Sequence, residues 1–250
     1  MTYCVAVIVD EGISFCSDSR TSAGVDQINT YSKMFRFGTD GNRQFVIMAA
    51  GNLATSQAVI DRMSKDIAKQ TEVNLNTVED VYEAADYVGQ ISVEQQNKTG
   101  GGAAYEASFI LGGQVIGNPP QLTLIYPQGN HIRTSDQTPY LQIGESKYGK
   151  PILDRIITSQ TDLHTAALCS LVSMDSTMRS NLTVGPPIDV QLYYANSLMP
   201  GEYYHLAEDS EYLKTINRIW NEHMLKSFAS LPPLDSSLAV VSGTSEKPVS

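Results

Sequence analysis

Segments that read as strands and segments that read as helices follow one another in blocks, and this order limits the folds open to the chain. Apolar runs come first, two helical stretches follow, strands return, and helices lead to a last strand and a last helix. Such blocks are typical of antiparallel sheets with segregated helices. We therefore predict an α+β fold, a four-layer α/β/β/α sandwich in which two stacked sheets lie between two helical layers.

The first strands are expected almost at the start of the chain. Tyr3–Val9 and 13–16 are apolar runs on either side of Asp10-Glu11-Gly12, which predicts a hairpin. A second pair is expected over 33–37 and 44–50. The other strands are expected over 107–111, 122–126, 132–134, 140–143 and 188–194. Apolar residues at helical spacing predict helices over 52–70, 77–97, 151–157, 163–179 and 210–225.

The length and composition bound the organisation of the molecule. A chain of 250 residues suits one large domain, which we place at 1–227, followed by a Ser/Pro-rich tail at 228–250. The net charge of -10 argues against nucleic acid as a partner, since nucleic acid binding needs a basic surface. No apolar stretch approaches the roughly 20 residues that span a bilayer, so no membrane partner is expected.

The cysteines and the start of the chain bear on the compartment. Cys4, Cys16 and Cys169 are odd in number and widely spaced, which favours reduced thiols. The first residues show no basic region of a secretory signal. We therefore expect a cytoplasmic protein.

Several familiar motifs are absent. The sequence has no HExxH, no histidine pair at ligand spacing and no GxSxG, so no metal and no cofactor are expected. Residues 144–150 fit the phosphate-loop pattern GxxxxGK. However, Pro151 replaces the hydroxyl residue that holds magnesium, and Glu145 would repel phosphate. Nucleotide binding is therefore disfavoured.

The second residue offers a nucleophile. Initiator methionine is usually removed when the next residue is small, which would leave Thr2 at the start of the mature chain. A leading threonine carries a hydroxyl and an α-amine on one residue. An amine that titrates near pH ~8 can act as a general base at neutral pH. The strand expected directly after Thr2 would hold it rigidly.

Two charged residues are placed to assist Thr2. The predicted hairpin brings Asp18 back toward the chain start, and Lys33 begins the next expected strand. A lysine between Asp18 and Thr2 would lower the pKa of the hydroxyl and the amine, while the carboxylate would orient the lysine. The same residues also permit a plainer interpretation, an ordinary partly exposed ion pair.

In this order the motifs resemble those of proteasome β-subunits and the bacterial HslV peptidase, which are N-terminal-nucleophile hydrolases. The shared motifs are Thr2 before a strand, Asp18-Ser19-Arg20, Lys33, Ala50-Gly51, Ile110-Leu111-Gly112-Gly113 and Ile143-Gly144. A closer resemblance is to the Anbu family of bacterial proteasome-type homologues. It is carried by residues 1–6, residues 17–21, Gly24-Val25-Asp26 and residues 175–187, and it covers about residues 2–225.

The resemblance implies a threonine peptidase that hydrolyses peptide bonds. Thr2 would attack the carbonyl, Asp18 and Lys33 would assist, and the backbone N–H of Gly51 would stabilise the oxyanion. By the same match, Ser22, Gly51 and Leu53 would lie along the substrate, and Ala49 and Leu53 would line the first specificity pocket. The expected substrate is a peptide or an unfolded protein.

The second half of the expected site departs from the proteasome pattern. Proteasome subunits have Gly-Ser-Gly where this chain has Gly144-Glu145-Ser146. Ser146 could supply the supporting hydroxyl, or Glu145 could replace it. Asp175 fits the family's later aspartate, but Met178 stands where a serine is expected three residues further on, with Ser176 and Ser180 nearby. The choice among these residues stays open.

The family also implies partners and alternatives. Proteasome-type subunits assemble, so we expect a homo-oligomer, either a closed ring or an open spiral, and an unfolding ATPase is a further candidate partner. Two other functions stay open. The chain could be an inactive assembly subunit, or it could be an amidase that acts on small molecules with the same nucleophile.

Overall fold

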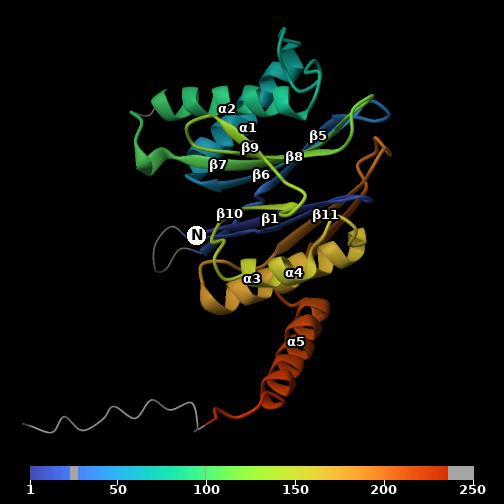
Figure 1. Cartoon of the computed structure of the whole chain (residues 1–250). Helices are drawn as coiled ribbons and strands as arrows, with labels where there is room; N and C mark the ends of the chain where they lie inside the picture. The colour runs from blue at the N-terminus through green and yellow to red at the C-terminus, as the bar shows by residue number, and fades with distance from the viewer. Residues whose placement is uncertain (23–27, 99, 236–250) are drawn as a thin grey trace, which may run out of the picture.

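The molecule is built from four layers, as predicted. The computed structural model describes residues 1–22, 28–98 and 100–235. Two antiparallel five-stranded sheets lie face to face, with helices α1 and α2 on one outer face and α3 and α4 on the other (Figure 1). The predicted four-layer α+β sandwich is therefore confirmed.

The first sheet contains the first two strands of the chain and the last two. Its strand order is β10-β1-β2-β11-β12, so the leading strand β1 lies between β10 and β2. The bounds are β1 Tyr3–Val9, β2 Gly12–Asp18, β10 Tyr140–Gly144, β11 Ile188–Tyr194 and β12 Glu202–Leu206. Both faces of β1 are covered, by the second sheet and by α4, which explains its unbroken apolar run.

The second sheet has the order β5-β6-β7-β8-β9. Its strands are β5 Met34–Thr39, β6 Arg43–Gly51, β7 Ala107–Val115, β8 Gln121–Ile125 and β9 His131–Arg133. A separate two-stranded ribbon pairs β3 (Arg20–Ser22) with β4 (Ile28–Thr30).

Three apolar clusters fill the three spaces between the four layers. Phe15, Met48 and Ile110 belong to the cluster between the sheets. A second cluster joins the first sheet to α3 and α4, and a third joins the second sheet to α1 and α2. The helices are α1 Leu53–Lys69, α2 Val81–Lys98, α3 Lys150–Ile156, α4 Leu163–Ser180 and α5 Glu211–Ala229, with a 3-10 turn at Ala103–Tyr105.

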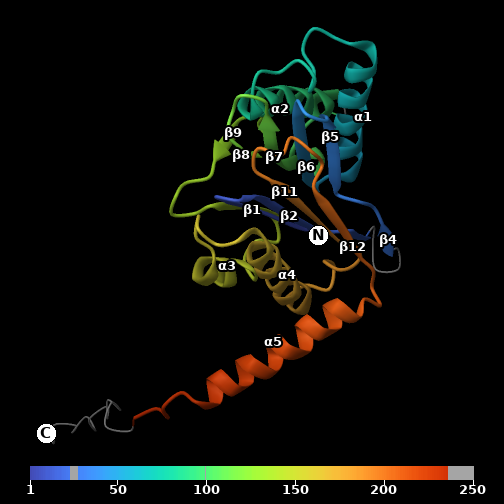
Figure 2. The ribbon, with the colours of Figure 1, turned by 90° about the vertical axis from the view of Figure 1, so that its right-hand side faces the viewer.

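The last helix differs from the others because it leaves the sandwich. Figure 2 shows α5 projecting from the α4 side of the body. None of its 19 residues is buried. Because α5 ends at Ala229, it continues past residue 227, where the sequence analysis places the boundary between the domain and the tail. The division into domain and tail remains a prediction. Residues 236–250 and the motif Gly24-Val25-Asp26 lie outside the described residues. Within the described residues, no helix has both the length and the apolar character needed to cross a membrane.

Candidate active site

Thr2 is fixed where the leading strand enters the sheet. The Thr2 carbonyl accepts a hydrogen bond from the N–H of Glu145 at 2.8 Å. The N–H of Tyr3 donates to Asp18 Oδ1 at 3.0 Å. Because β10 and β2 flank β1 on both sides, Tyr3 pairs with Gly144 and the next residue pairs across β2. The chain start is therefore held by strand pairing and not left as a frayed end.

Asp18 and Lys33 form a buried ion pair beside the chain start. Lys33 Nζ lies 2.7 Å from Asp18 Oδ1 and also donates to the carbonyl of Arg20 at 2.7 Å. The other carboxylate oxygen, Oδ2, accepts the N–H of Gly185 at 3.2 Å. Asp18 is 0% exposed and Lys33 is 6% exposed. Both charges are thus desolvated and hydrogen-bonded, unlike those of a surface ion pair.

Burial and these charges shift two pKa values. Burial raises the pKa of Asp18, against the opposing effects of the Lys33 charge and of the hydrogen bonds from Lys33, Tyr3 and Gly185. Burial and then the Lys33 charge lower the pKa of the α-amine of Met1, while Asp18 and Glu145 oppose that shift. This amine stands one residue ahead of Thr2, and a lowered pKa leaves more of it neutral at pH 7.

A cavity of about 270 Å³ opens beside Thr2. It gathers five of the residues singled out in the sequence, and these come from four separate segments: Thr2, Lys33, Ala49, Gly51 and Leu53. The remaining lining residues were not predicted as site residues. They lie in β3, in the link between β4 and β5, in β5, in β6 and in the first turns of α1: Thr21, Tyr31, Ser32, Phe35, Ala50, Ser56 and Gln57. Each lies within four residues of a predicted site residue, which is the sequence signal that could have found them.

Gly51 lies where β6 ends and α1 is about to begin. Its φ of +110° belongs to the region that favours glycine, and a Cβ atom there would lie 2.4 Å from the carbonyl oxygen of Glu106. The next residue, Asn52, caps α1 by accepting the N–H of Thr55 at 2.9 Å. The positive end of the α1 dipole therefore lies beside the cavity, where it favours negative charge.

Glu145 and Ser146, at the second half of the predicted site, both lie in the loop after β10. Glu145 Oε2 accepts a hydrogen bond from Asn181 Nδ2 at 3.1 Å, and its charge acts on the chain-start amine. Ser146 is joined to Gly144 and Gln142 through its backbone. Ser146 carries no charge, so of these two residues only Glu145 acts by its charge on the Met1 amine.

Asp175, Ser176 and Ser180 lie on α4 instead. Asp175 accepts a hydrogen bond from Asn217 Nδ2 of α5 at 2.8 Å. The residues that line the cavity beside Thr2 do not include these three. Ser22 ends β3, where it pairs with Ile28 of β4. Glu145 contacts Thr2 through its backbone N–H, whereas Asp175 contacts α5, and the catalytic role of Asp175 stays a prediction.

Several solved structures are similar to the chain. "Anbu (ancestral beta-subunit)" from Yersinia bercovieri is 44% identical, with a TM-score of 0.90, and the match covers 94% of this chain and 99% of that one. The "Helical Assembly of the Anbu Complex" from Pseudomonas aeruginosa is 45% identical, with a TM-score of 0.90 and coverage of 95% and 100%. A (Gly-1) mutant of Anbu from Hyphomicrobium sp. strain MC1 is 39% identical, with a TM-score of 0.90 and coverage of 94% and 100%. No protein-family model and no curated protein matches the chain.

Proposed function

The chain belongs to the Anbu family of proteasome-type β-subunit homologues, and from that premise we propose that it is a threonine peptidase whose nucleophile is Thr2 after loss of Met1. The observation that carries this function is the placement of Thr2 in one cavity with Lys33 and Gly51, in front of the buried Asp18. These groups match the parts that acyl transfer requires: a nucleophile, a base, a fixed cation and an oxyanion donor.

The reaction proceeds in two stages. The Thr2 amine accepts the hydroxyl proton as Oγ attacks the peptide carbonyl, and the N–H of Gly51 donates to the oxyanion. The amine then returns the proton to the departing amino group, which leaves an ester on Thr2. Water, activated by the same amine, hydrolyses that ester and restores the free hydroxyl. Lys33 lowers the pKa of the Thr2 hydroxyl throughout, and Asp18 holds Lys33 in position.

Glu145 occupies the place of the hydroxyl that the proteasome pattern has next to the amine. In the chain that begins at Met1, its negative charge raises the pKa of the Met1 amine against the effect of Lys33, and we expect the same direction for the Thr2 amine. Asn181 fixes its carboxylate by a hydrogen bond of 3.1 Å. We assign Glu145 the tuning of the base in place of Ser146, Ser176 and Ser180.

A peptide-library digest tests the function and separates it from its alternatives. We expect cleavage within peptides that depends on the hydroxyl of Thr2, so that a Thr2→Ala chain leaves the library intact. Hydrolysis of small amides without peptide cleavage would support the amidase alternative. A chain that begins at Thr2, is folded, and cleaves neither class would be an inactive assembly subunit. Mass spectrometry of the digest identifies the products and the cleavage sites.

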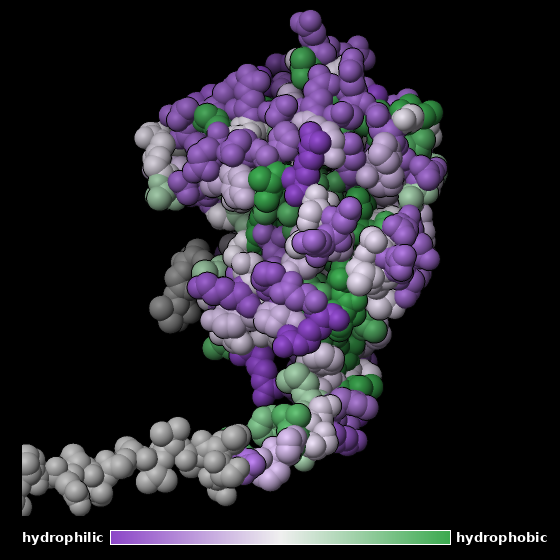
Figure 3. All heavy atoms as spheres, viewed as in Figure 1, coloured by the Kyte–Doolittle hydropathy of each residue, from purple (hydrophilic) through white to green (hydrophobic). Residues whose placement is uncertain are grey.

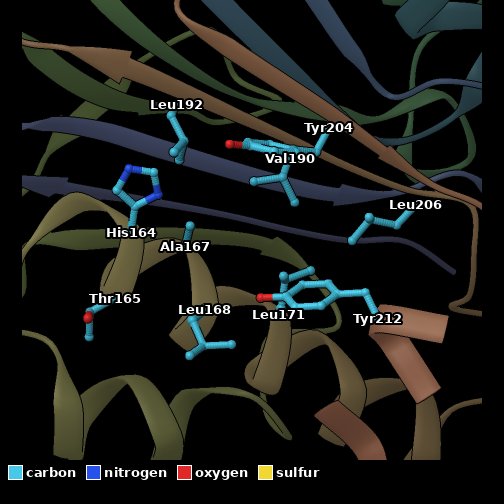
Figure 4. Close-up of a pocket in the computed structure, with 10 residues that line it drawn as sticks. All are labelled: His164, Thr165, Ala167, Leu168, Leu171, Val190, Leu192, Tyr204, Leu206 and Tyr212. Atoms are coloured by element: carbon cyan, nitrogen blue, oxygen red, sulfur yellow. The ribbon is translucent and has the colours of Figure 1, made fainter. Parts of the chain in front are cut away.

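The α5 helix provides a surface for assembly with a second copy. Its base adjoins an apolar hollow of about 510 Å³ between α4, β11 and β12, lined by residues that include Leu168, Leu192 and Tyr204 (Figure 4). A second hollow of about 620 Å³ lies between α4 and α5. Figure 3 shows hydrophobic side chains reaching the surface on α5 and where it joins the body. An uncovered apolar surface of this kind marks an interaction site.

We expect two copies of α5 to pair antiparallel. Tyr212, Ile219 and His223 recur at helical spacing on the side of α5 that borders the hollow between α4 and α5. Glu211 near its first residue and Lys226 near its last would then face each other across a two-fold axis. The helical assembly described for the Pseudomonas aeruginosa relative supports a homo-oligomer for this chain as well.

Charging the centre of this surface should weaken the assembly. In an Ile219→Glu variant we expect the dissociation constant between copies to rise at least about tenfold, because a buried interface residue would become charged. Ile132→Glu on β9 is the matched control, since Ile132 is 41% exposed and Ile219 is 43% exposed. Sedimentation velocity measures the association of both variants. Equal association by the two variants would exclude α5 as the contact.

A further inference from the structure

Asp189 is a buried carboxylate that belongs to none of the groups assigned above. It lies on β11, where it pairs with Ser17 of β2 on one side and with His205 of β12 on the other. Only 1% of Asp189 is exposed. A charge buried to that extent requires hydrogen-bond partners to offset its lost hydration.

The Asp189 carboxylate receives four hydrogen bonds. Oδ1 accepts from the Tyr203 hydroxyl at 2.7 Å and lies 2.7 Å from Nδ1 of His205, both on β12. Oδ2 accepts from Ser19 Oγ at 3.1 Å and from Ser32 Oγ at 3.2 Å, and Ser32 shares its one hydroxyl proton between Asp189 and the Met34 carbonyl at 3.1 Å. Oδ1 therefore connects Asp189 to the edge strand β12, and Oδ2 connects it to two serines in different segments.

These two serines are the direct neighbours of the ion pair. Ser19 follows Asp18 in the chain, and Ser32 precedes Lys33. The two segments also meet through their backbones, because the N–H of Tyr31 donates to the Ser19 carbonyl at 3.0 Å. One carboxylate oxygen thus ties the segment that carries the acid to the segment that carries the lysine.

We infer that Asp189 is a positioning residue that holds Asp18 and Lys33 in register beside Thr2, through its hydrogen bonds to Ser19 and Ser32. This role rests on the proposed function and deepens it. Asp189 is not catalytic, since its hydrogen-bond partners are the two serines, Tyr203 and His205, and not Thr2. Hydrogen bonds to a charged acceptor are strong enough to fix side-chain and loop geometry. Displacements of about 1 Å at such a distance from the chemistry can cost a factor of ~10² in rate.

The kinetic test uses a β-lactone that acylates an N-terminal threonine. In Asp189→Asn, which keeps the shape but loses the charge, we expect the maximal acylation rate to fall about 10- to 100-fold. The concentration for half-maximal rate should stay within about twofold, because the cavity walls are intact. Ser19→Ala removes one tie with little effect on packing and should lower the same rate in the same direction.

The matched control is Asp66→Asn. Asp66 is also buried, at 6% exposed, and it accepts hydrogen bonds from Tyr87 and Arg62 on the other side of the molecule. The Asp66→Asn variant should lose stability as Asp189→Asn does, but its acylation rate should equal that of the unaltered chain. Equal rates in folded Asp189→Asn, folded Ser19→Ala and the unaltered chain would overturn the positioning role.

A second readout does not depend on activity. Acetylation of Lys33 by an N-hydroxysuccinimide ester, followed by peptide mass spectrometry, reports how tightly Lys33 is held. We expect it to be about fivefold faster in Asp189→Asn than in the unaltered chain and in Asp66→Asn, relative to the exposed Lys98. If no chain reacts with the lactone, the peptidase function fails while this test still stands. Unchanged protection of Lys33 in Asp189→Asn would overturn the inference itself.

Discussion

A Lys33→Met variant should fold but lose about 3–5 kcal/mol in the free energy of unfolding, and its reaction with a threonine-directed lactone should stop. The stability loss follows from the burial of the pair, because removing one partner leaves the Asp18 carboxylate without its counter-charge in a desolvated site. The loss of reaction follows because no other cation among the described residues lining the cavity can lower the pKa of the Thr2 hydroxyl.

The stability loss should grow as the pH rises. Burial already raises the pKa of Asp18, and Lys33 opposes that shift by its charge and its hydrogen bond. Without Lys33 the folded-state pKa rises further, whereas an unfolded aspartate titrates near ~3.9. The folded variant then binds a proton that the unfolded chain has lost, so its stability decreases as the pH rises through the folded-state pKa. Denaturant unfolding at pH 5 and pH 8 should show the larger deficit at pH 8.

Two further variants separate the buried pair from general effects. Asp18→Asn combined with Lys33→Met removes both charges and should recover about half of the lost stability, yet it should remain unreactive. Lys214→Met breaks an exposed, solvent-screened pair with Glu211 and should leave the free energy of unfolding nearly unchanged. A Lys33→Met chain with full stability and normal lactone reaction would contradict the assignment of this pair.

The layered fold could be predicted from the sequence because buried segments are apolar, and the order of the apolar segments along the chain indicates the order of strands and helices. The strands predicted at 3–9, 44–50, 107–111 and 188–194 are all central in their sheets, where both faces are covered and the apolar runs are unbroken. The ribbon strands β3 and β4 have three residues each, which is too short for a periodic pattern. The edge strand β12 is mostly exposed and shows no apolar run, so it was missed.

The candidate site was predictable only where chain topology decides proximity. A hairpin places the end of β2 near the start of β1, and this is enough to bring Asp18 to Thr2. The contacts of Glu145 depend on Asn181, which is far away in the sequence, and those of Asp189 depend on four donors from three segments. No pattern among neighbouring residues in the sequence indicates such contacts. In the sequence, Asp189 is simply a polar residue in a predicted strand.

Removal of everything before Thr2 should raise the reaction rate by about 10²- to 10⁴-fold, the usual contribution of a positioned general base. When a residue precedes Thr2, the Thr2 nitrogen belongs to a peptide bond and cannot accept the hydroxyl proton. Two chains released from a cleavable fusion give the matched comparison, one beginning at Thr2 and one with a single glycine in front of it. Both should unfold at the same denaturant concentration, because the hydrogen bonds of β1 begin with the Thr2 carbonyl and the Tyr3 N–H.

The pH dependence of the fast chain should report the amine. Burial and the Lys33 charge lower the pKa of the Met1 amine. We expect the Thr2 amine, which lies one residue further into the site, to shift in the same direction, so the acylation rate should reach its plateau below the ordinary amine titration near ~8. In Glu145→Gln the opposing negative charge is gone, and the plateau should begin at a still lower pH. Rates measured from pH 5 to pH 9 give both curves.

The position of the covalent adduct tests the nucleophile most directly. After reaction with the β-lactone, peptide mass spectrometry of the chain that begins at Thr2 should find one adduct per molecule, on Thr2 itself. In the same time the glycine-extended chain should carry at most a trace of adduct, and Thr2→Ala should carry none. An adduct on another residue, or equal labelling of the Thr2→Ala chain, would contradict the peptidase account.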